Sequence, residues 1–423
     1  MSDSERVIVR IGLDDTDHPE GGCTTYDLNE LSRLLIRDID SAQEIERRLV
    51  RLWPFAERRT RGNAALCLLI SINTTDVETL YETLQHWIPE PDNSEIGSAS
   101  RPAIVVGLGS PPASWYWETV RGYVALDDRL SSIEASDYRV ITRSDRPHGA
   151  IGASAAIAWP ASEFTWELVA WRYPNRIGSP RAVDAELIGS MSVKYPGTFA
   201  NRDPTTGRCL IAPRTPCPVL YGIRGLNESS VIDAHNDLQS YDSIEDSIEY
   251  GTHRTNQCSD DHLENTFVGT VTSEPVIGPG GHVSLTVMSM GKSETILAFK
   301  EGGPVNAEVR LMHAGDIIRW VGLRSPDDSI HLERVCLIDP VPVIKNRPKC
   351  CGTAMKSGGK RSVLRCSKCE KKCKRSWVSN PLRNAGLWAE PPPSHRRHIA
   401  KPLSEGPPDT TARMPTELTS QPK

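Results

Sequence analysis

The segment that is most informative about the fold and function of this chain is Val7-Ile-Val-Arg-Ile-Gly-Leu-Asp-Asp-Thr-Asp17, followed by Pro19-Glu-Gly-Gly-Cys-Thr-Thr-Tyr26. Its first part is apolar and β-branched, which predicts a buried strand. Asp14, Asp15 and Asp17 then fall within four residues. Such carboxylates repel one another, and their burial is costly unless a cation compensates for the charge. Because Mg²⁺ prefers a few carboxylates together with phosphate oxygens, we predict a magnesium–phosphate site after this strand.

The residues after the aspartates fit the same chemistry. Gly21 and Gly22 permit a close backbone approach to a ligand, and Cys23-Thr24-Thr25 offers nucleophiles or hydroxyl groups that face a phosphate. The alternative is a solvated acidic turn after an ordinary strand. A surface turn, however, requires neither three aspartates nor the adjoining glycine pair.

Length and composition indicate a multidomain globular protein. The chain has 423 residues, of which 38% are hydrophobic, and this length predicts roughly three domains. No apolar run is long enough to span a membrane, and the first residues lack the pattern of a signal peptide. We therefore expect a cytoplasmic protein without membrane association or an obligate protein partner. Eleven cysteines in such a chain indicate free thiols and a metal cluster rather than disulfides.

The charge distribution points to nucleic acid. The net charge is -5, yet residues 345–375 hold twelve Lys or Arg and a single acid, Glu370. Such asymmetry is typical of a basic module that meets phosphate backbones. A disordered basic tail is the alternative, but the cysteines inside the segment favour a folded unit. The candidate RNA-binding residues are Lys356, Lys360, Arg361, Arg365 and Lys368.

Hydrophobic periodicity divides the first half of the chain into two modules. Residues 1–140 alternate helices and strands as an α/β catalytic module, residues 141–235 form a second module, and residues 236–262 read as a polar linker. The expected elements are helices over residues 26–39, 77–87 and 149–159 and strands over residues 66–72, 104–108, 165–173 and 218–223.

Residues 263–340 predict a small β-barrel. Five strands are expected, with a short, partly helical stretch between the third and the fourth, which matches a Greek-key barrel of the OB type. Such barrels bind single-stranded nucleic acid on one face. Only Phe267, Phe299 and Trp320 are available for stacking. The strands are expected over residues 266–273, 282–289, 294–300, 316–323 and 330–338, and the helical stretch over residues 305–313.

Residues 345–378 contain cysteines with zinc-ribbon spacing. Cys366-x-x-Cys369 is a regular knuckle, whereas Cys350 and Cys351 are adjacent and lack the usual two intervening residues. A tetrahedral zinc site would use Cys366, Cys369, one or both of Cys350 and Cys351, and Cys373 as a further candidate. The alternative is a basic loop with unligated thiols. Residues 379–423 are Pro-rich and expected to be mostly disordered, although residues 391–398 could dock.

Two further groups could bind phosphate. Arg59 and Arg61 could clamp a triphosphate, with Gly62 and Asn63 leading into the next strand. A basic surface loop is the alternative. His148 and Gly149, with Gly152, open a helix whose free amides could hold an anion, and plain helix packing is equally compatible with the glycines.

The same segments resemble one family, the archaeal tRNA(Ile) 2-agmatinylcytidine synthetases. The resemblance extends along the chain in order. The matching motifs are Gly12-Leu-Asp-Asp-Thr-Asp17 with Gly22-Cys-Thr-Thr-Tyr26, Thr60-Arg-Gly-Asn63, Gly149-Ala-Ile-Gly-Ala153, Ala170-Trp-Arg-Tyr-Pro174, Thr215-Pro-Cys-Pro-Val-Leu-Tyr-Gly-Ile-Arg-Gly225 and Arg396-Arg-His-Ile-Ala-Lys-Pro402.

The resemblance implies a kinase-like domain, a ferredoxin-like domain, an OB fold and a zinc ribbon. It also implies a reaction in which ATP phosphorylates the ring carbonyl oxygen of the wobble cytidine in the tRNA(Ile) with a CAU anticodon, after which agmatine displaces phosphate. The implied cofactors are ATP, Mg²⁺ and Zn²⁺. The aspartates would serve the metal–phosphate site, and Thr24, directly after the motif's cysteine, would become phosphorylated. The adjacent cysteines at 350 and 351 depart from the family's usual Cys-x-x-Cys.

Two other functions are compatible with parts of the sequence. Asp15-Thr-Asp17 after a strand fits a dehalogenase-type phosphatase superficially, but the acidic pair Asp260-Asp261 that could complete such a site falls in the expected linker. A nucleic-acid-binding factor built from the barrel and the ribbon would leave residues 1–225 unexplained.

Overall fold

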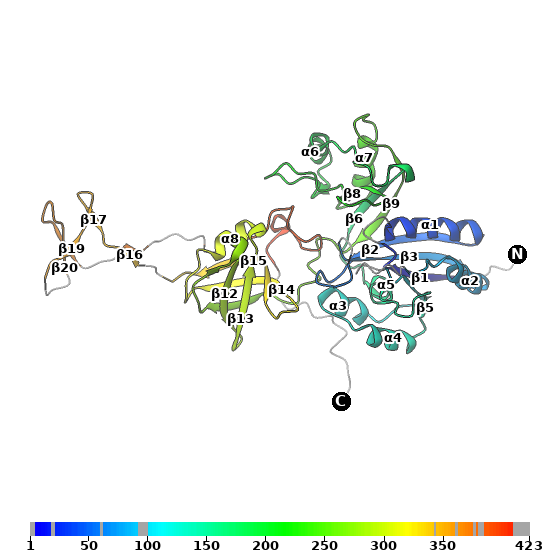
Figure 1. Ribbon diagram of the computed structural model, residues 1–423, viewed down its shortest axis with the longest axis horizontal. Coiled ribbons are helices and arrows are strands. Elements are labelled where there is room, and N and C mark those ends of the chain that lie inside the picture. Colours follow the sequence, from blue (N-terminus) through cyan, green and yellow to red (C-terminus); the bar gives the residue numbers. More distant parts are fainter. Residues whose placement is uncertain are drawn as a thin grey trace. The chain divides into compact units, whose positions relative to one another are not determined.

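The computed structural model describes residues 5–17, 22–59, 62–91, 100–341, 344–359, 363–374, 378–379 and 385–408. The chain forms two compact units (Figure 1). The first consists of Met1–Glu264 together with Pro392–Gly406, and the second of Asn265–Pro391. Within the described part of the chain, no helix is both long and apolar enough to cross a membrane.

A single nine-stranded sheet runs through the first unit and joins both of the modules expected there. Its strand order is β5-β4-β1-β3-β2-β9-β6-β8-β7. Neighbouring strands are antiparallel, except that β2 and β9 pair in parallel. The strands are β1 (Arg6–Asp14), β2 (Gln43–Arg51), β3 (Ala64–Asn73), β4 (Ala103–Leu108), β5 (Arg139–Ile141), β6 (Thr165–Arg172), β7 (Thr198–Phe199), β8 (Val219–Gly225) and β9 (Ser247–Thr255).

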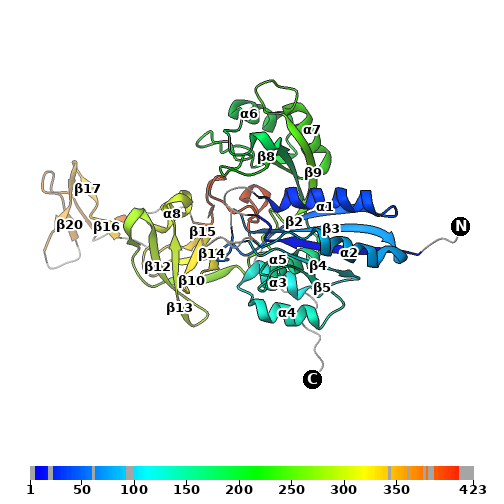
Figure 2. The ribbon, with the colours of Figure 1, turned by 45° about the vertical axis from the view of Figure 1, so that its right-hand side comes forward.

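Helices cover both faces of this sheet (Figures 1 and 2). Alternate residues of β3 show the arrangement, because Leu66 and Leu68 pack in the cluster with α1 while Ala65 and Cys67 pack in the cluster with α5. Burial on both faces explains the continuous apolar run of β3. The helices are α1 (Thr24–Asp38), α2 (Val77–Trp87), α3 (Ser114–Arg121), α4 (Leu126–Glu134), α5 (Gly149–Ala158), α6 (Ala185–Lys194) and α7 (Glu228–Leu238).

Helix α5 was expected in the second module, and it packs on β1, β3 and β4. Its small residues allow this close approach. A Cβ atom on Gly12 of β1 would overlap the main-chain oxygen of Ala153. The helix therefore lies directly against the strand that carries the aspartates.

The polar linker expected over residues 236–262 is wrong. These residues contain the end of α7 and all of β9, which lies inside the sheet between β2 and β6. The inward residues of β9 include Gly251, His253 and Thr255, of which His253 is fully buried. Because polar side chains replace apolar ones at these positions, the strand carries no hydrophobic pattern.

The second unit contains a closed barrel, and all five expected strands and the short helix are confirmed. Hydrogen bonding runs around β10-β14-β15-β13-β12 and closes between β12 and β10. The elements are β10 (Phe267–Val271), β12 (Val283–Ser289), β13 (Lys292–Ala298), α8 (Pro304–Val309), β14 (Ile317–Arg324) and β15 (Ile330–Asp339), with the edge strands β11 (Val276–Ile277) and β23 (Trp388–Ala389).

Of the three barrel aromatics available for stacking, Trp320 lies in the interior and Phe267 is partly buried against the core. Trp320 is fully buried and stacks on Phe267, with ring centroids 5.9 Å apart. The barrel needs these rings to fill its core. Phe299 instead contacts the rings of His282 and His331.

A chain of short strands follows the barrel. These are β16 (Ile344–Asn346), β17 (Lys349–Cys350), β18 (Thr353–Ala354), β19 (Lys356–Ser357), β20 (Val363–Arg365), β21 (Lys372–Lys374) and β22 (Val378–Ser379). Their buried core consists of Met355, Leu364 and Cys366. This is far smaller than the cores of the sheet and of the barrel.

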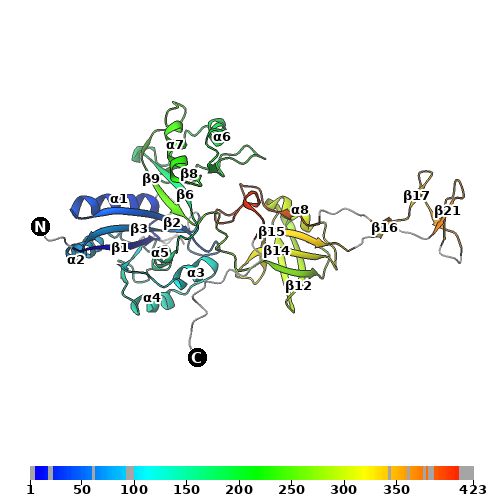
Figure 3. The same cartoon turned by 180° about the vertical axis from the view of Figure 1, so that it is seen from behind.

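The Pro-rich tail is ordered over residues 385–408, which corrects the expectation of a mostly disordered tail. Docking was considered for residues 391–398, and it is confirmed for residues 392–398, which belong to the first unit. Figure 3 shows the molecule from behind. The main-chain oxygens of His398 and Ile399 accept hydrogen bonds from the N–H groups of Cys258 and Asp260, at 3.1 and 3.0 Å. Ile399 is buried in the core beside α5.

Candidate functional site

The three aspartates lie where β1 ends. Asp15 adopts a left-handed backbone conformation, with φ of +59°, which costs energy for a residue with a side chain. Burial raises the pKa of Asp14 well above its ordinary value, and the carboxylates of Asp15 and Asp17 raise it further. Burial also raises the pKa of Asp15, to about 7, although Arg58 opposes this shift. A site that disfavours several negative charges in this way fits a divalent cation.

Glycines in α5 make room for the first of these carboxylates. A Cβ atom on Gly152 would overlap Oδ2 of Asp14, and one on Gly149 would crowd the main-chain oxygen of the same residue. The N–H of Gly149 also donates to the main-chain oxygen of Arg101, at 3.1 Å. The geometry thus gives both glycines a packing role beside the carboxylates.

A cavity of about 310 Å³ opens at the aspartates. Its lining includes Arg59, Gly62, Asn63 and His148 from the expected set, together with apolar side chains such as Trp53 and Ile151. Asn63 anchors the neighbouring loop, since its amide donates to the main-chain oxygen of Trp53 at 2.8 Å. The cavity therefore offers carboxylates, cations and an apolar surface to one ligand.

Two arginines of this cavity were missed by sequence reasoning. Arg58 lies with its Nε 3.9 Å from Oδ2 of Asp15, and Arg146 lines the same wall as His148. Their only signal was proximity in sequence to Arg59 and His148. The guanidinium of Arg59 donates to the main-chain oxygen of Ala56, at 2.8 Å.

The other expected residues of this site are differently placed. Thr24 is buried as the first residue of α1 and, like Gly22, does not line the cavity. The neighbouring Thr25 hydroxyl contacts the Cys23 thiol at 3.0 Å and accepts from the Trp171 indole at 3.2 Å. Gly21 and Arg61 lie outside the described residues.

A second cavity of about 380 Å³ lies in the same unit, between the β8 region and the docked tail. Arg208, Arg224, Arg396 and Arg397 line it, against one acid, Glu405. Three residues that line it have a buried atom without a hydrogen-bond partner among the described residues, namely Nε of Arg208, Nε of Arg224 and Oε1 of Gln257. This cavity suits a ligand that is rich in negative charge and hydrogen-bonding groups.

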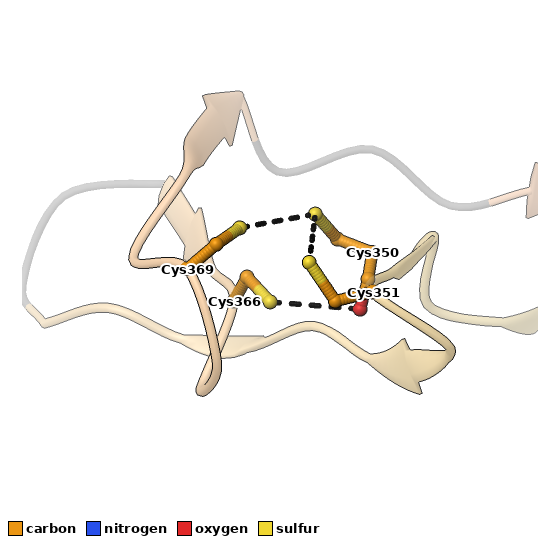
Figure 4. Close-up of side chains that lie close together, drawn as sticks. All are labelled: Cys350, Cys351, Cys366 and Cys369. Carbon is orange, nitrogen blue, oxygen red and sulfur yellow. Dashed lines mark hydrogen bonds between the residues drawn. The ribbon is translucent and has the colours of Figure 1, made fainter.

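Four cysteines of the second unit form a thiol cluster, shown in Figure 4. The Sγ atoms of Cys350, Cys351, Cys366 and Cys369 all lie within 4.8 Å of one another. The distances from the Cys350 Sγ are 3.5 Å to Cys369 and 4.0 Å to Cys351. Tetrahedral zinc with Zn–S bonds of about 2.3 Å requires sulfur separations of about 3.8 Å. The thiols present therefore fit zinc.

Cys373, the further candidate ligand, is not part of this cluster. Its thiol contacts the Met355 sulfur at 3.6 Å and packs against the small core. Within the cluster, the backbone N–H groups of Cys369 and Lys368 lower the pKa of the Cys366 thiol to about 6. Lowering this pKa favours the thiolate that a metal requires.

The basic residues around the thiol cluster are exposed where they are described. Lys356 and Lys368 face solvent, and Arg365 pairs with Glu370. Lys360 and Arg361 lie outside the described residues. A carboxylate-lined cavity in one unit and a basic, thiol-bearing module in the other are the features expected of a nucleic-acid-modifying enzyme.

Comparison with known proteins identifies which enzyme family this is. Residues 10–144 match the family model of the TiaS TCKD domain, and residues 147–262 match that of the TiaS FLD domain. The isoleucine-tRNA 2-agmatinylcytidine synthetase TiaS of Archaeoglobus fulgidus is 31% identical over 417 residues, covering 93% of this chain and 97% of that protein. The TiaS of Methanopyrus kandleri is also 31% identical, covering 93% and 96%.

Solved structures agree with this assignment. The crystal structure of TiaS in complex with its isoleucine tRNA and ATP has a TM-score of 0.79 at 29% identity and covers 96% of this chain and 99% of that chain. A complex of TiaS with the same tRNA, AMPCPP and agmatine has a TM-score of 0.78 at 26% identity, with the same coverage. This chain belongs to the TiaS family of isoleucine-tRNA 2-agmatinylcytidine synthetases.

Proposed function

We propose that this protein is an ATP-dependent ligase that joins agmatine to the wobble cytidine of the AUA-decoding tRNA(Ile) with a CAU anticodon, forming 2-agmatinylcytidine. The observation that carries the proposal is the cavity at Asp14, Asp15 and Asp17, in a chain that aligns almost end to end with synthetases of this name. Neither a phosphatase nor a simple binding factor accounts for that alignment.

The chemistry required is activation of a poor leaving group. The ring carbonyl oxygen of cytidine leaves slowly, and a phosphoryl group from ATP turns it into phosphate, which leaves readily. The agmatine amine then forms the new C–N bond, phosphate departs and the amine gives up a proton. The protein's contribution to such a transfer is positioning and neutralisation of charge.

We assign these tasks to residues of the first cavity. Asp14, Asp15 and Asp17 would hold Mg²⁺, which supplies charge neutralisation at the polyphosphate when bound. Arg58, Arg59 and Arg146 are placed to neutralise the remaining phosphate charge, a task that guanidinium groups perform bidentately. Outside the described residues, Arg61 remains a prediction for the same role, as does Gly21 for the backbone approach.

Thr24 is the proposed phosphoryl acceptor on the enzyme. Its support is the family motif, in which it directly follows Cys23, and its position at the start of α1, close in sequence to the aspartates. The contacts of the Thr25 hydroxyl with Trp171 and Cys23 favour a structural role for Thr25 instead.

The RNA is proposed to contact both units. The charged residues that line the second cavity of the first unit are four arginines, one histidine and a single acid, so the cavity disfavours dicationic agmatine and favours a nucleotide of the tRNA. In the second unit we propose an OB fold for the barrel and a zinc ribbon for the basic module, with Lys356, Lys360, Arg361, Arg365 and Lys368 on RNA phosphates. Kinase-like and ferredoxin-like folds are proposed for residues 1–140 and 141–235, and a cytoplasmic location for the protein.

The direct test is product formation. The full chain is incubated with ATP, agmatine and a transcript of the tRNA, and the wobble nucleoside is analysed by mass spectrometry. We expect a mass increase corresponding to agmatine minus water, dependent on all three substrates. A transcript with uridine at the wobble position is the matched control and should remain unmodified. Unmodified wobble cytidine, or ATP consumption that needs neither RNA nor agmatine, would contradict the proposal.

A further inference from the structure

The hairpin that carries the first two thiols has an unusual residue in its turn. Strands β17 and β18 pair through Lys349 with Ala354 and Cys350 with Thr353, so that only Cys351 and Gly352 connect them. Both connecting residues have positive φ, +48° and +75°. A two-residue turn of this kind favours Asn, Asp or Gly at its first position. A cysteine there carries a conformational cost that its packing does not explain, since Cys351 is exposed.

This conformation brings two adjacent thiols to one point. In extended backbone, successive side chains point to opposite faces of a strand, so neighbouring cysteines cannot ligate one ion together. The positive φ of Cys351 reverses that direction, and its Sγ lies 4.0 Å from that of Cys350. Figure 4 shows both thiols directed toward Cys366 and Cys369.

The spacing of the cysteines explains why such a solution is needed. The second knuckle has Cys366 and Cys369 three positions apart. The same spacing counted back reaches Arg347 from Cys350 and Pro348 from Cys351. Neither position is a cysteine, so the first knuckle cannot have the regular spacing. Within the described residues, the thiol cluster reaches four members through Cys351.

We infer that Cys351 is the fourth metal ligand beside its neighbour Cys350, and that its strained turn is retained for this purpose. Cys373 takes no part in the site. The inference rests on the zinc site of the proposed function and goes beyond it by assigning the ligand set and the cause of the strain.

A substitution that is favourable for the turn separates ligation from structure. Cys351→Asn introduces a residue preferred at this turn position, so a purely structural role predicts an unchanged or more stable hairpin. If Cys351 is a ligand, the same substitution should instead weaken metal binding. We expect the zinc affinity of the full chain, measured by competition with a chelating dye, to fall by more than about tenfold, since one of four thiolates is lost. The Co²⁺-loaded protein should change from a four-thiolate to a three-thiolate absorption spectrum.

Two further variants complete the experiment. Cys373→Ser is the matched control and should keep wild-type affinity and spectrum. Arg347→Cys, added to Cys351→Asn, restores a regular Cys-x-x-Cys and should recover the four-thiolate spectrum. A wild-type chain that binds neither zinc nor Co²⁺ would remove the proposed zinc site itself.

The remaining outcomes bear on Cys351 alone. Wild-type metal binding that persists unchanged in Cys351→Asn would overturn the ligand role of Cys351 while leaving the zinc site standing. Loss without recovery in the double variant would overturn the idea that the strained turn at Cys351 substitutes for a regular Cys-x-x-Cys.

Discussion

The aspartate cluster at the end of β1 and the thiol cluster of the basic module pose the same physical problem and solve it differently. Each gathers like-charged ligands that repel one another without a cation. The aspartates extend from a strand whose Val9, Ile11 and Leu13 are fully buried, with α5 packed against it. The thiols rest on a core of Met355, Leu364 and Cys366. A large core can hold repelling groups in place by itself, whereas a very small one depends on the ion for its fold.

The largest effect should come from removing one aspartate. Asp14→Asn, Asp15→Asn or Asp17→Asn should each lower the rate of agmatine transfer by at least about a hundredfold, because ligation and charge neutralisation are lost. The melting temperature should stay the same or rise, since repulsion is relieved. Asp40→Asn, an exposed aspartate in the same unit, is the control and should change neither quantity. A variant that melts much earlier would show that these aspartates support the fold.

Substituting the proposed acceptor hydroxyl tests whether the site at the aspartates transfers a phosphoryl group from ATP to the protein itself. With labelled ATP, Thr24→Ala should lose the phosphoryl adduct and most activity. Thr25→Ala should retain the adduct and lose only its hydrogen bonds to Trp171 and Cys23, about 1 kcal/mol of unfolding free energy. Retention of the adduct in Thr24→Ala would assign the phosphate to another hydroxyl.

Removing metal from the thiol cluster should affect binding of RNA rather than the catalytic unit. Cys366→Ser, or replacement of residues 345–378 by a short polar linker that keeps the docked residues 392–406, should weaken tRNA binding and flatten its salt dependence by roughly one unit of slope for each phosphate that the protein no longer neutralises. ATP affinity and the thermal unfolding of the first unit should remain unchanged. Equal tRNA affinity and salt slope in the protein that lacks residues 345–378 would place the RNA-binding surface elsewhere.

The packing of α5 can be tested with a single methyl group. Gly152→Ala places a Cβ against the Asp14 carboxylate, and we expect a loss of about 1–3 kcal/mol in unfolding free energy together with reduced activity. Gly302→Ala is the matched control, because its added Cβ would meet only Val305 at an ordinary 3.8 Å. Tolerance of Gly152→Ala would mean that the helix is not held tightly at the aspartates.

The most gradual expected effect is a dependence of the stability of the first unit on pH. Burial lowers the pKa of His235 to about 4, and the Tyr221 hydroxyl lies 2.9 Å from its Nδ1. Because the folded pKa lies below the unfolded value of about 6.5, the stabilisation is fully present above pH 6.5 and is lost as the pH falls toward 4. The loss should reach at most about 3 kcal/mol, measured by denaturant unfolding. His235→Gln should flatten this dependence, and an equally steep curve would assign it to other groups.

Local pattern was sufficient to determine the elements that carry the chemistry. The β-branched run before Asp14, the helical spacing of α1 and α2, the five barrel strands and the Cys366–Cys369 knuckle were all predicted, because side-chain periodicity reflects the backbone of the same few residues. The functional family followed from motifs of the same local kind. None of these required knowledge of residues far away in the chain.

Only the tertiary structure decided which distant groups meet. It placed polar β9 inside the sheet, buried Trp320 in the barrel, docked residues 392–406 beside β8 and α5, and brought Arg58 and Arg146 to the aspartates. It also excluded Cys373 from the thiol cluster and admitted Cys351. A buried polar strand or a strained cysteine is stabilised by partners supplied from elsewhere in the chain. Its role therefore cannot be predicted from the local sequence pattern.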